Sequence, residues 1–177
     1  IITSVEMKIY PIAETRIFQA YTFPSTHDGL NAIRNFIHKG LRPAVVRLYD
    51  EVEAVPKISS YGFEKGFVLL ILVFEGNKEM SELEAGMTKE ICLGNNGRYK
   101  GELAAREWLE TRFSTKKMLD FDAIKGGTAD AIEVAAPWDC IENVWREMRK
   151  ALEPMCTVVD CHFSHVYHNG ASVYVIY

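Results

Sequence analysis

The chain has 177 residues, the length of one domain, and its 48% of hydrophobic residues is enough for a sizeable core. Its net charge of −4, from 20 Lys and Arg against 24 Asp and Glu, argues against nucleic acid as the main partner. The longest apolar run, 67–74, is too short to span a membrane. Four cysteines without a C-x-x-C pair exclude a disulfide scaffold and favour a reduced, cytoplasmic setting.

Hydrophobic periodicity predicts the elements in chain order. Strands are expected at 4–12, 16–23, 43–50, 67–74 and 129–135, followed by a hairpin over 158–177 that turns at Asn169-Gly170. Helices are expected from 24–26 to Gly40, around 80–91, over 102–113, and up to Leu152 behind the capping-box spacing of Asp139 and Glu142.

This order of elements predicts one α+β domain over residues 1–177, with helices on one face of a mostly antiparallel sheet, in the manner of a ferredoxin-like fold. The run 67–74 is apolar on both faces and is expected to be a central, covered strand. No helix is left for the second face of the sheet. That face is therefore expected to meet solvent, a partner or another domain.

Two polar residues stand inside apolar strands. Arg47 is the only charge in AVVRLY and shares a face with Val45 and Tyr49. It is either a surface arginine or a fixed cation for an anionic ligand. Tyr174 shares a face with Ser172 and is either a half-buried strand residue or a proton donor or acceptor.

Histidines gather in the closing hairpin, where His162, His165 and His168 follow Cys161. Regular alternation would place His165 on the face opposite His162 and His168, and no H-E-x-x-H motif is present. We therefore expect no metal site.

A basic stretch, Arg106, Arg112, Lys116 and Lys117, is either a solvated surface or a contact for phosphate or carboxylate. The glycine-bearing segments match no phosphate-binding motif.

Several stretches resemble, in the same order, the C-terminal substrate (cap) domain of the FAD-linked oxidases. They are ITSVEMKIYPIAETRIFQAYTFPS, GLRPAVVRLYDE, FVLLILVFEGN, EVAAPWD and SHVYHNGASVY. The similarity is to the branch of alkyldihydroxyacetonephosphate synthase and glycolate oxidase-like enzymes. It implies a fragment of a longer flavoenzyme, inactive alone, whose FAD is bound mainly by another domain of the same polypeptide. The chain stops inside the strand SVYVIY, which fits this expectation. A homodimer is also expected.

The resemblance assigns roles to individual residues. Arg47 matches the family's active-site arginine, and Tyr174 matches the tyrosine of G-A-x-x-Y, a proposed acid/base near the flavin. Both are expected to be catalytic, and His165, Lys117 and Arg112 are expected to bind substrate.

One position departs from the pattern of the synthases. Leu119 stands where the synthases carry a phosphate-binding arginine. Either Lys116 or Lys117 replaces that arginine, or the substrate has no phosphate at this point.

Three functions follow from these observations. The first is a cap domain of an FAD-dependent oxidoreductase for a small 2-hydroxy acid such as glycolate or D-lactate, favoured by the missing phosphate arginine. The second is the ether-lipid synthase reaction, with a membrane-associated lipid substrate, favoured by GLRPAVVRLYDE and the Tyr174 motif. The third is a free-standing, non-catalytic ligand-binding domain, which the exposed apolar terminal strand argues against.

Overall fold

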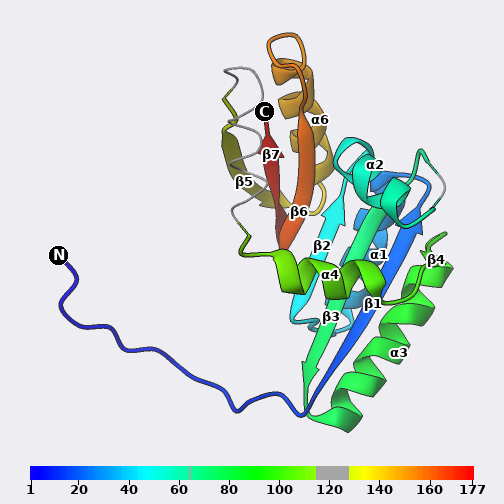
Figure 1. The fold of residues 1–177 in the computed structure, drawn as a ribbon, viewed down its shortest axis with the longest axis vertical. Coiled ribbons are helices and arrows are strands. Elements are labelled where there is room, and N and C mark those ends of the chain that lie inside the picture. The colour runs from blue at the N-terminus through cyan, green and yellow to red at the C-terminus, as the bar shows by residue number, and fades with distance from the viewer. Residues whose placement is uncertain (64, 115–127) are drawn as a thin grey trace.

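The chain folds around a seven-stranded sheet in the order β4-β1-β3-β2-β6-β7-β5 (Figure 1). The computed structural model describes residues 1–63, 65–114 and 128–177. Every paired strand is antiparallel.

The strands are β1 (Thr15–Phe23), β2 (Val45–Tyr49), β3 (Val68–Gly76), β4 (Arg98–Tyr99), β5 (Ala131–Pro137), β6 (Asp160–Tyr167) and β7 (Gly170–Ile176). The helices are α1 (Thr26–His38), α2 (Glu51–Ser60), α3 (Lys78–Gly94), α4 (Leu103–Thr111) and α6 (Ile141–Leu152). The predicted α+β class and mostly antiparallel sheet are confirmed.

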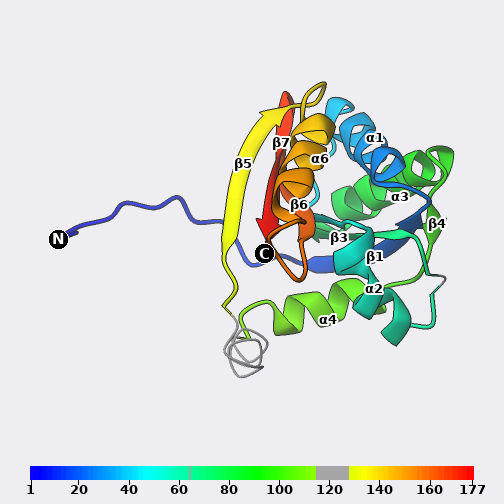
Figure 2. The same cartoon turned by 90° about the horizontal axis from the view of Figure 1, so that it is seen from above.

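Helices pack on both faces of the sheet, which corrects the expectation that they occupy one face only (Figure 2). Helices α1, α3 and α6 cover one face, here the α1 face, over a core that includes Phe36, Leu48, Leu70 and Phe163. Helices α2 and α4 cover β1, β3 and β2 on the opposite face, here the α4 face. The reason is the apolar character of both sides of β3, whose residues 68–74 are all buried. Both of its sides need a helix layer.

Part of the α4 face has no helix of the described chain packed on it. The side chains of β7 and β5 that point to this face include Ser172, Tyr174 and Glu133, which are polar. The expected uncovered face therefore exists, but only over this end of the sheet.

Two elements were not expected, and one expected strand is absent. Helix α2 carries Pro56 and several β-branched residues, which disfavour a helix, yet Asp50 caps its start by accepting the amide hydrogens of Val52 and Glu53. The two-residue strand β4 pairs with β1. Residues 4–12 form no strand, because the described chain offers them no pairing partner, and their apolar side chains are exposed.

Of the two helix N-caps predicted from the sequence, one is present in the structure and one is not. Ser25 caps α1 as expected, by accepting the amide hydrogen of Asp28. The predicted capping box at α6 is wrong. The N-cap residue there is Cys140, without a side-chain bond, and Glu142 contacts His27 and Arg146 instead.

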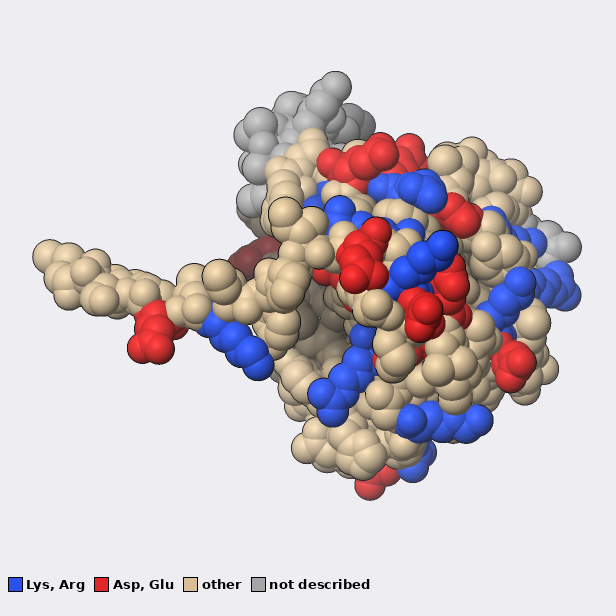
Figure 3. Space-filling model, turned by 90° about the horizontal axis from the view of Figure 1, so that it is seen from below, with Lys and Arg blue, Asp and Glu red and all other residues tan. Residues whose placement is uncertain are grey.

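Charged side chains of both signs are interspersed on the surface shown in Figure 3 and do not form a patch of one sign. Within the residues that the structure describes, no helix has the length and apolar character needed to cross a membrane.

Candidate functional site

A row of polar and aromatic side chains crosses the α4 face. It begins beside α2 and runs onto the part of the sheet that no described helix covers. Register places Tyr49 of β2 opposite His162 of β6, His162 opposite Tyr174 of β7, and Tyr174 opposite Glu133 of β5. Directly opposite residues on one sheet face lie within contact distance. Four strands far apart in the sequence therefore bring these side chains together.

Arg47 lies at the edge of this row, on the face shared with Val45 and Tyr49, as predicted. Its guanidinium lies over the rings of Tyr49, at 5.2 Å, and of Trp108 in α4, at 5.9 Å. Its Nε is buried and has no hydrogen-bond partner among the described residues. Of the carboxylates in that part of the chain, Glu53 comes nearest, with Oε1 3.9 Å from Nη2. Arg47 is therefore a half-buried cation with unused donors.

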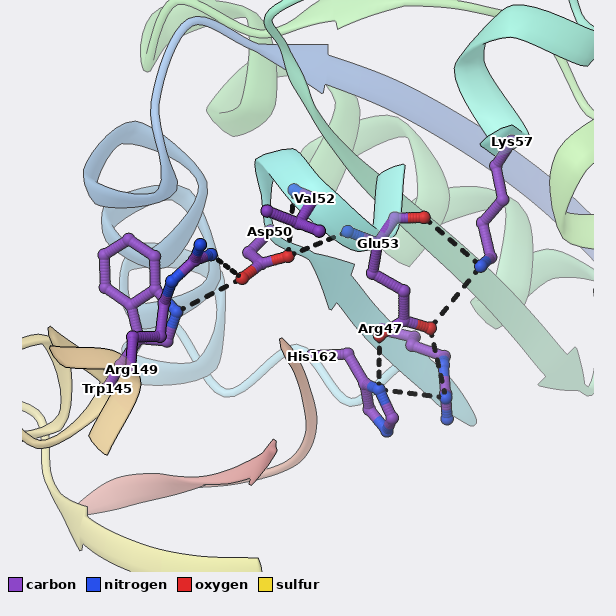
Figure 4. Close-up of polar contacts among 8 residues, drawn as sticks. All are labelled: Arg47, Asp50, Val52, Glu53, Lys57, Trp145, Arg149 and His162. Carbon is purple, nitrogen blue, oxygen red and sulfur yellow. Dashed lines mark hydrogen bonds and ion pairs between the residues drawn. The ribbon is translucent and has the colours of Figure 1, made fainter. Parts of the chain in front are cut away.

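Glu53 reaches this cluster from α2 and binds His162 (Figure 4). Its Oε2 lies 2.7 Å from Nδ1 of His162, and its Oε1 lies 3.4 Å from Nζ of Lys57. Burial by itself would raise the pKa of Glu53, but the hydrogen-bond contact with His162 and the positive charges of Lys57 and Arg47 outweigh it and lower the pKa. Glu53 is therefore ionised at neutral pH.

His162 is 3% exposed, and its ring is stacked on the ring of Tyr174 with centroids 4.9 Å apart. Burial lowers its pKa, and the charges of Arg47 and Lys57 lower it further, although Glu53 opposes them. A neutral imidazole thus stands between Arg47 and Tyr174.

His165 lies on the same face, which corrects the prediction from regular alternation. A β-bulge between Phe163 and His165 inserts one residue into β6, so His162 faces Tyr174 and His165 faces Ser172. Its Nδ1 lies 2.8 Å from Oε1 of Glu133.

The hydroxyl of Ser172 donates to the same Oε1 of Glu133, also at 2.8 Å. The hydrogen bonds from Ser172 and from His165 lower the pKa of Glu133. Glu133 is therefore an anion that fixes His165 at the open end of the row.

The two basic residues of the predicted substrate site have different outcomes. Arg112 follows α4 and lies 5.7 Å from the ring of Trp108, which Arg47 also contacts. It therefore belongs to the border of the same face. Lys117, like Lys116 and Leu119, lies outside the described residues.

A second polar cluster holds α2 in place (Figure 4). The carboxylate of Asp50 is fully buried, and its Oδ2 accepts hydrogen bonds from Nη1 of Arg149 at 2.6 Å and Nε1 of Trp145 at 3.4 Å. Because Asp50 also caps α2, this cluster sets the position of Glu53 one turn later.

Sequence reasoning missed Glu53, Trp108 and the role of His162. An acidic residue three positions after Asp50 is a common helix-start pattern and carries no sign of a partner 109 residues away. The sequence pattern indicates His162 only as a possible metal ligand. Within the described chain, no group of three His, Cys, Asp or Glu side chains is arranged to hold a metal ion.

Comparison with known proteins identifies the family to which this arrangement belongs. Residues 12–177 match the family model described as FAD linked oxidases, C-terminal domain. The chain belongs to this family. The FAD-linked oxidase C-terminal domain thus accounts for all the described secondary structure, which starts at Thr15.

Its curated relatives are longer proteins. The chain is 25% identical over 195 residues to the uncharacterized FAD-linked oxidoreductase YgcU of Escherichia coli K12, covering 99% of this chain and 38% of that protein. It is 21% identical over 207 residues to alkyldihydroxyacetonephosphate synthase of Dictyostelium discoideum, covering all of this chain and 34% of that protein. The C-terminal domain therefore spans little more than a third of these relatives.

Solved structures share the fold. An alkyldihydroxyacetonephosphate synthase structure superposes on 96% of this chain and 36% of its own, with a TM-score of 0.83 at 20% identity. A 4-ethylphenol oxidase from Gulosibacter chungangensis, in complex with isoeugenol, covers 96% of this chain and 40% of its own, with a TM-score of 0.72 at 11% identity.

Proposed function

We propose that the chain is the substrate-binding cap domain of an FAD-dependent oxidoreductase acting on a small 2-hydroxy acid of the glycolate or D-lactate type. The observation that carries the proposal is Arg47. Its guanidinium has a buried Nε without a partner and no carboxylate of the described chain closer than 3.9 Å. A cation kept short of partners beside a polar sheet face suits an anionic ligand, and guanidinium matches carboxylate geometry with two parallel donors.

The proposed chemistry needs one cation and one proton acceptor. Arg47 would hold the substrate carboxylate. The hydroxyl proton would pass to Nε2 of His165, whose Nδ1 is engaged by Glu133, or to the phenolate form of Tyr174, which lies on β7 in the same row. Bound FAD would accept the hydride from the substrate carbon that carries the hydroxyl group. The product is the corresponding 2-oxo acid.

The residues of this chain fit a substrate bound beside the flavin ring better than they fit the pyrophosphate of FAD. Side chains of the chain itself cap α1, α2 and α3, namely Ser25, Asp50 and Asn77. These three helix N-termini, a common place for phosphate, already have an amide hydrogen engaged, whereas those of α4 and α6 have no side-chain cap. The α4 face offers Arg47, Tyr174 and His165, which suit a substrate. As the family match implies, the FAD would be held mainly by another domain of the same polypeptide.

A second function, the alkyldihydroxyacetonephosphate synthase reaction, is favoured by similarity to that enzyme in sequence and in structure. It would need a group for the substrate phosphate. Arg112, on the border of the α4 face, is one candidate within the described residues. In this version the ligand on Arg47 would be part of a lipid precursor.

The test is anaerobic reduction of the flavin in the full-length gene product. Under the first proposal D-lactate or glycolate bleaches the flavin absorbance, and Arg47→Met weakens the apparent substrate affinity by about a hundredfold, the value of one desolvated charge-assisted pair. Arg16→Met, which removes an exposed arginine paired with Glu75, is the matched control and should change nothing. No reduction by any 2-hydroxy acid, together with turnover of an acyl-dihydroxyacetonephosphate, would establish the second function instead.

A further inference from the structure

We propose that His162 is a positioning residue for Arg47 and Tyr174, fixed by Glu53 as a neutral imidazole with its proton on Nδ1. The proposal rests on the proposed function only for the ligand that Arg47 receives. His162 is too buried, at 3% exposure, to meet a substrate itself. Its contacts are instead with the two residues expected to do so. Nδ1 lies 3.2 Å from Nη2 of Arg47, and the ring is stacked on Tyr174 with 22° between the planes.

The position of the proton follows from the partners of Nδ1. This nitrogen lies 2.7 Å from a carboxylate oxygen of Glu53, which accepts hydrogen bonds, and 3.2 Å from a guanidinium nitrogen of Arg47, which donates them. It can serve only one of them. A bare Nδ1 would bring its lone pair against an ionised carboxylate at 2.7 Å, whereas an Nδ1–H donates to that carboxylate. We therefore assign the proton to Nδ1.

This assignment has a consequence for Arg47. An Nδ1–H cannot accept from Nη2, so the imidazole lies against the guanidinium without using its donors. Glu53, at 3.9 Å from Arg47, compensates part of its charge without a close hydrogen bond. His162 and Glu53 thus hold Arg47 in place and leave its donors for a ligand.

Titratable groups on several elements surround His162. They are Glu53 and Lys57 on α2, Arg47 and Tyr49 on β2, Asp160 on β6 itself, Tyr174 on β7 and Glu133 on β5. With His162 neutral, the three charged groups joined by ion-pair contacts, Arg47, Glu53 and Lys57, carry one net positive charge, which suits a carboxylate ligand. Protonation at acid pH would add a second positive charge beside Arg47.

The first measurement is ¹⁵N NMR of the chain labelled at its five histidines. We expect His162 to show the Nδ1–H form and to stay neutral at a pH where an ordinary histidine is half protonated. The Nε–H of Arg47 should exchange slowly with water, because this atom is buried. An Nε2–H form of His162 in the wild-type chain would overturn the proposal without any variant.

The second measurement uses Glu53→Gln and oxalate, a rigid dicarboxylate probe. The variant should lose the fixed Nδ1–H form, speed exchange of the Arg47 Nε–H, and weaken oxalate binding by about tenfold or more, the scale of losing an orienting partner. Glu142→Gln is the matched control, because Glu142 also contacts a histidine, His27, at 2.7 Å but from α6. Unchanged tautomer and exchange in Glu53→Gln would refute the positioning role. Failure of the wild type to bind oxalate would count against the proposed function alone.

Discussion

Replacing Asp160 by asparagine should stabilise the fold above pH 6 and leave it unchanged near pH 4. Asp160 begins β6, and its buried Oδ1 has no hydrogen-bond partner in the part of the chain that the structure describes. Burial, with the nearby charges of Glu53 and Asp50, raises the pKa of this carboxyl from 3.8 to about 6, and Lys57 and Arg149 offset only part of that effect.

The sign follows from the proton balance. At a pH between 3.8, the ordinary pKa of the carboxyl, and about 6, its pKa in the folded chain, the folded chain binds more protons at Asp160 than the unfolded chain does. The stability of the fold therefore falls as the pH rises through this interval. The two pKa values, 3.8 and about 6, differ by an amount worth at most about 3 kcal/mol. Because the side chain keeps some contact with solvent, we expect on the order of 2 kcal/mol at pH 8. Asparagine resembles the neutral carboxyl in shape and avoids this cost.

The assay is urea unfolding of the wild type and of Asp160→Asn at pH 4, 6 and 8. His162, whose pKa is lowered in the folded chain, changes the free energy of unfolding with pH in the opposite direction. It makes the fold less stable as the pH falls below 6.5, the ordinary pKa of histidine. The difference between the two proteins cancels that contribution. A difference in the free energy of unfolding that is equal at all three pH values would refute the reasoning, because it could not come from ionisation of Asp160.

Three other measurements follow from the structure. Arg149→Met should lower the free energy of unfolding by roughly 3 kcal/mol at pH 8, because it leaves the buried carboxylate of Asp50 without its cation, and the loss should shrink in acid as Asp50 takes up a proton. Gly170→Ala should cost on the order of 3 kcal/mol, since its Cβ would lie 2.2 Å from the carbonyl oxygen of Ala136, whereas Gly86→Ala, with open space around the Cβ, should be neutral or stabilising by about 0.5 kcal/mol. Denaturing electrophoresis of the native gene product should show a band on the order of 50 kDa, one further domain or more; a band at 20.1 kDa, the mass of this chain, would contradict the proposed flavoenzyme.

Local pattern was enough to predict much of the fold. Hydrophobic patterning located β1, β2, β5 and the closing hairpin, an apolar run on both faces located β3, and helical periodicity located α1, α3, α4 and α6. It failed at residues 4–12, because alternation describes a strand's side chains and cannot supply a partner for its backbone. It also failed at α2, whose cap at Asp50 is completed from α6 by Arg149 and Trp145.

Some residues of the candidate site could also be predicted from the sequence, and others could not. Arg47 and Tyr174 were visible in the sequence as polar residues within apolar strands, and alternation predicted the face on which Arg47 lies. Their neighbours were not visible. Glu53 meets His162 across 109 residues, and the bulge in β6 turns His165 to the same face. Strand order, register and helix packing depend on contacts between distant segments, so the tertiary structure alone determined that a carboxylate, an imidazole and a guanidinium meet on this sheet.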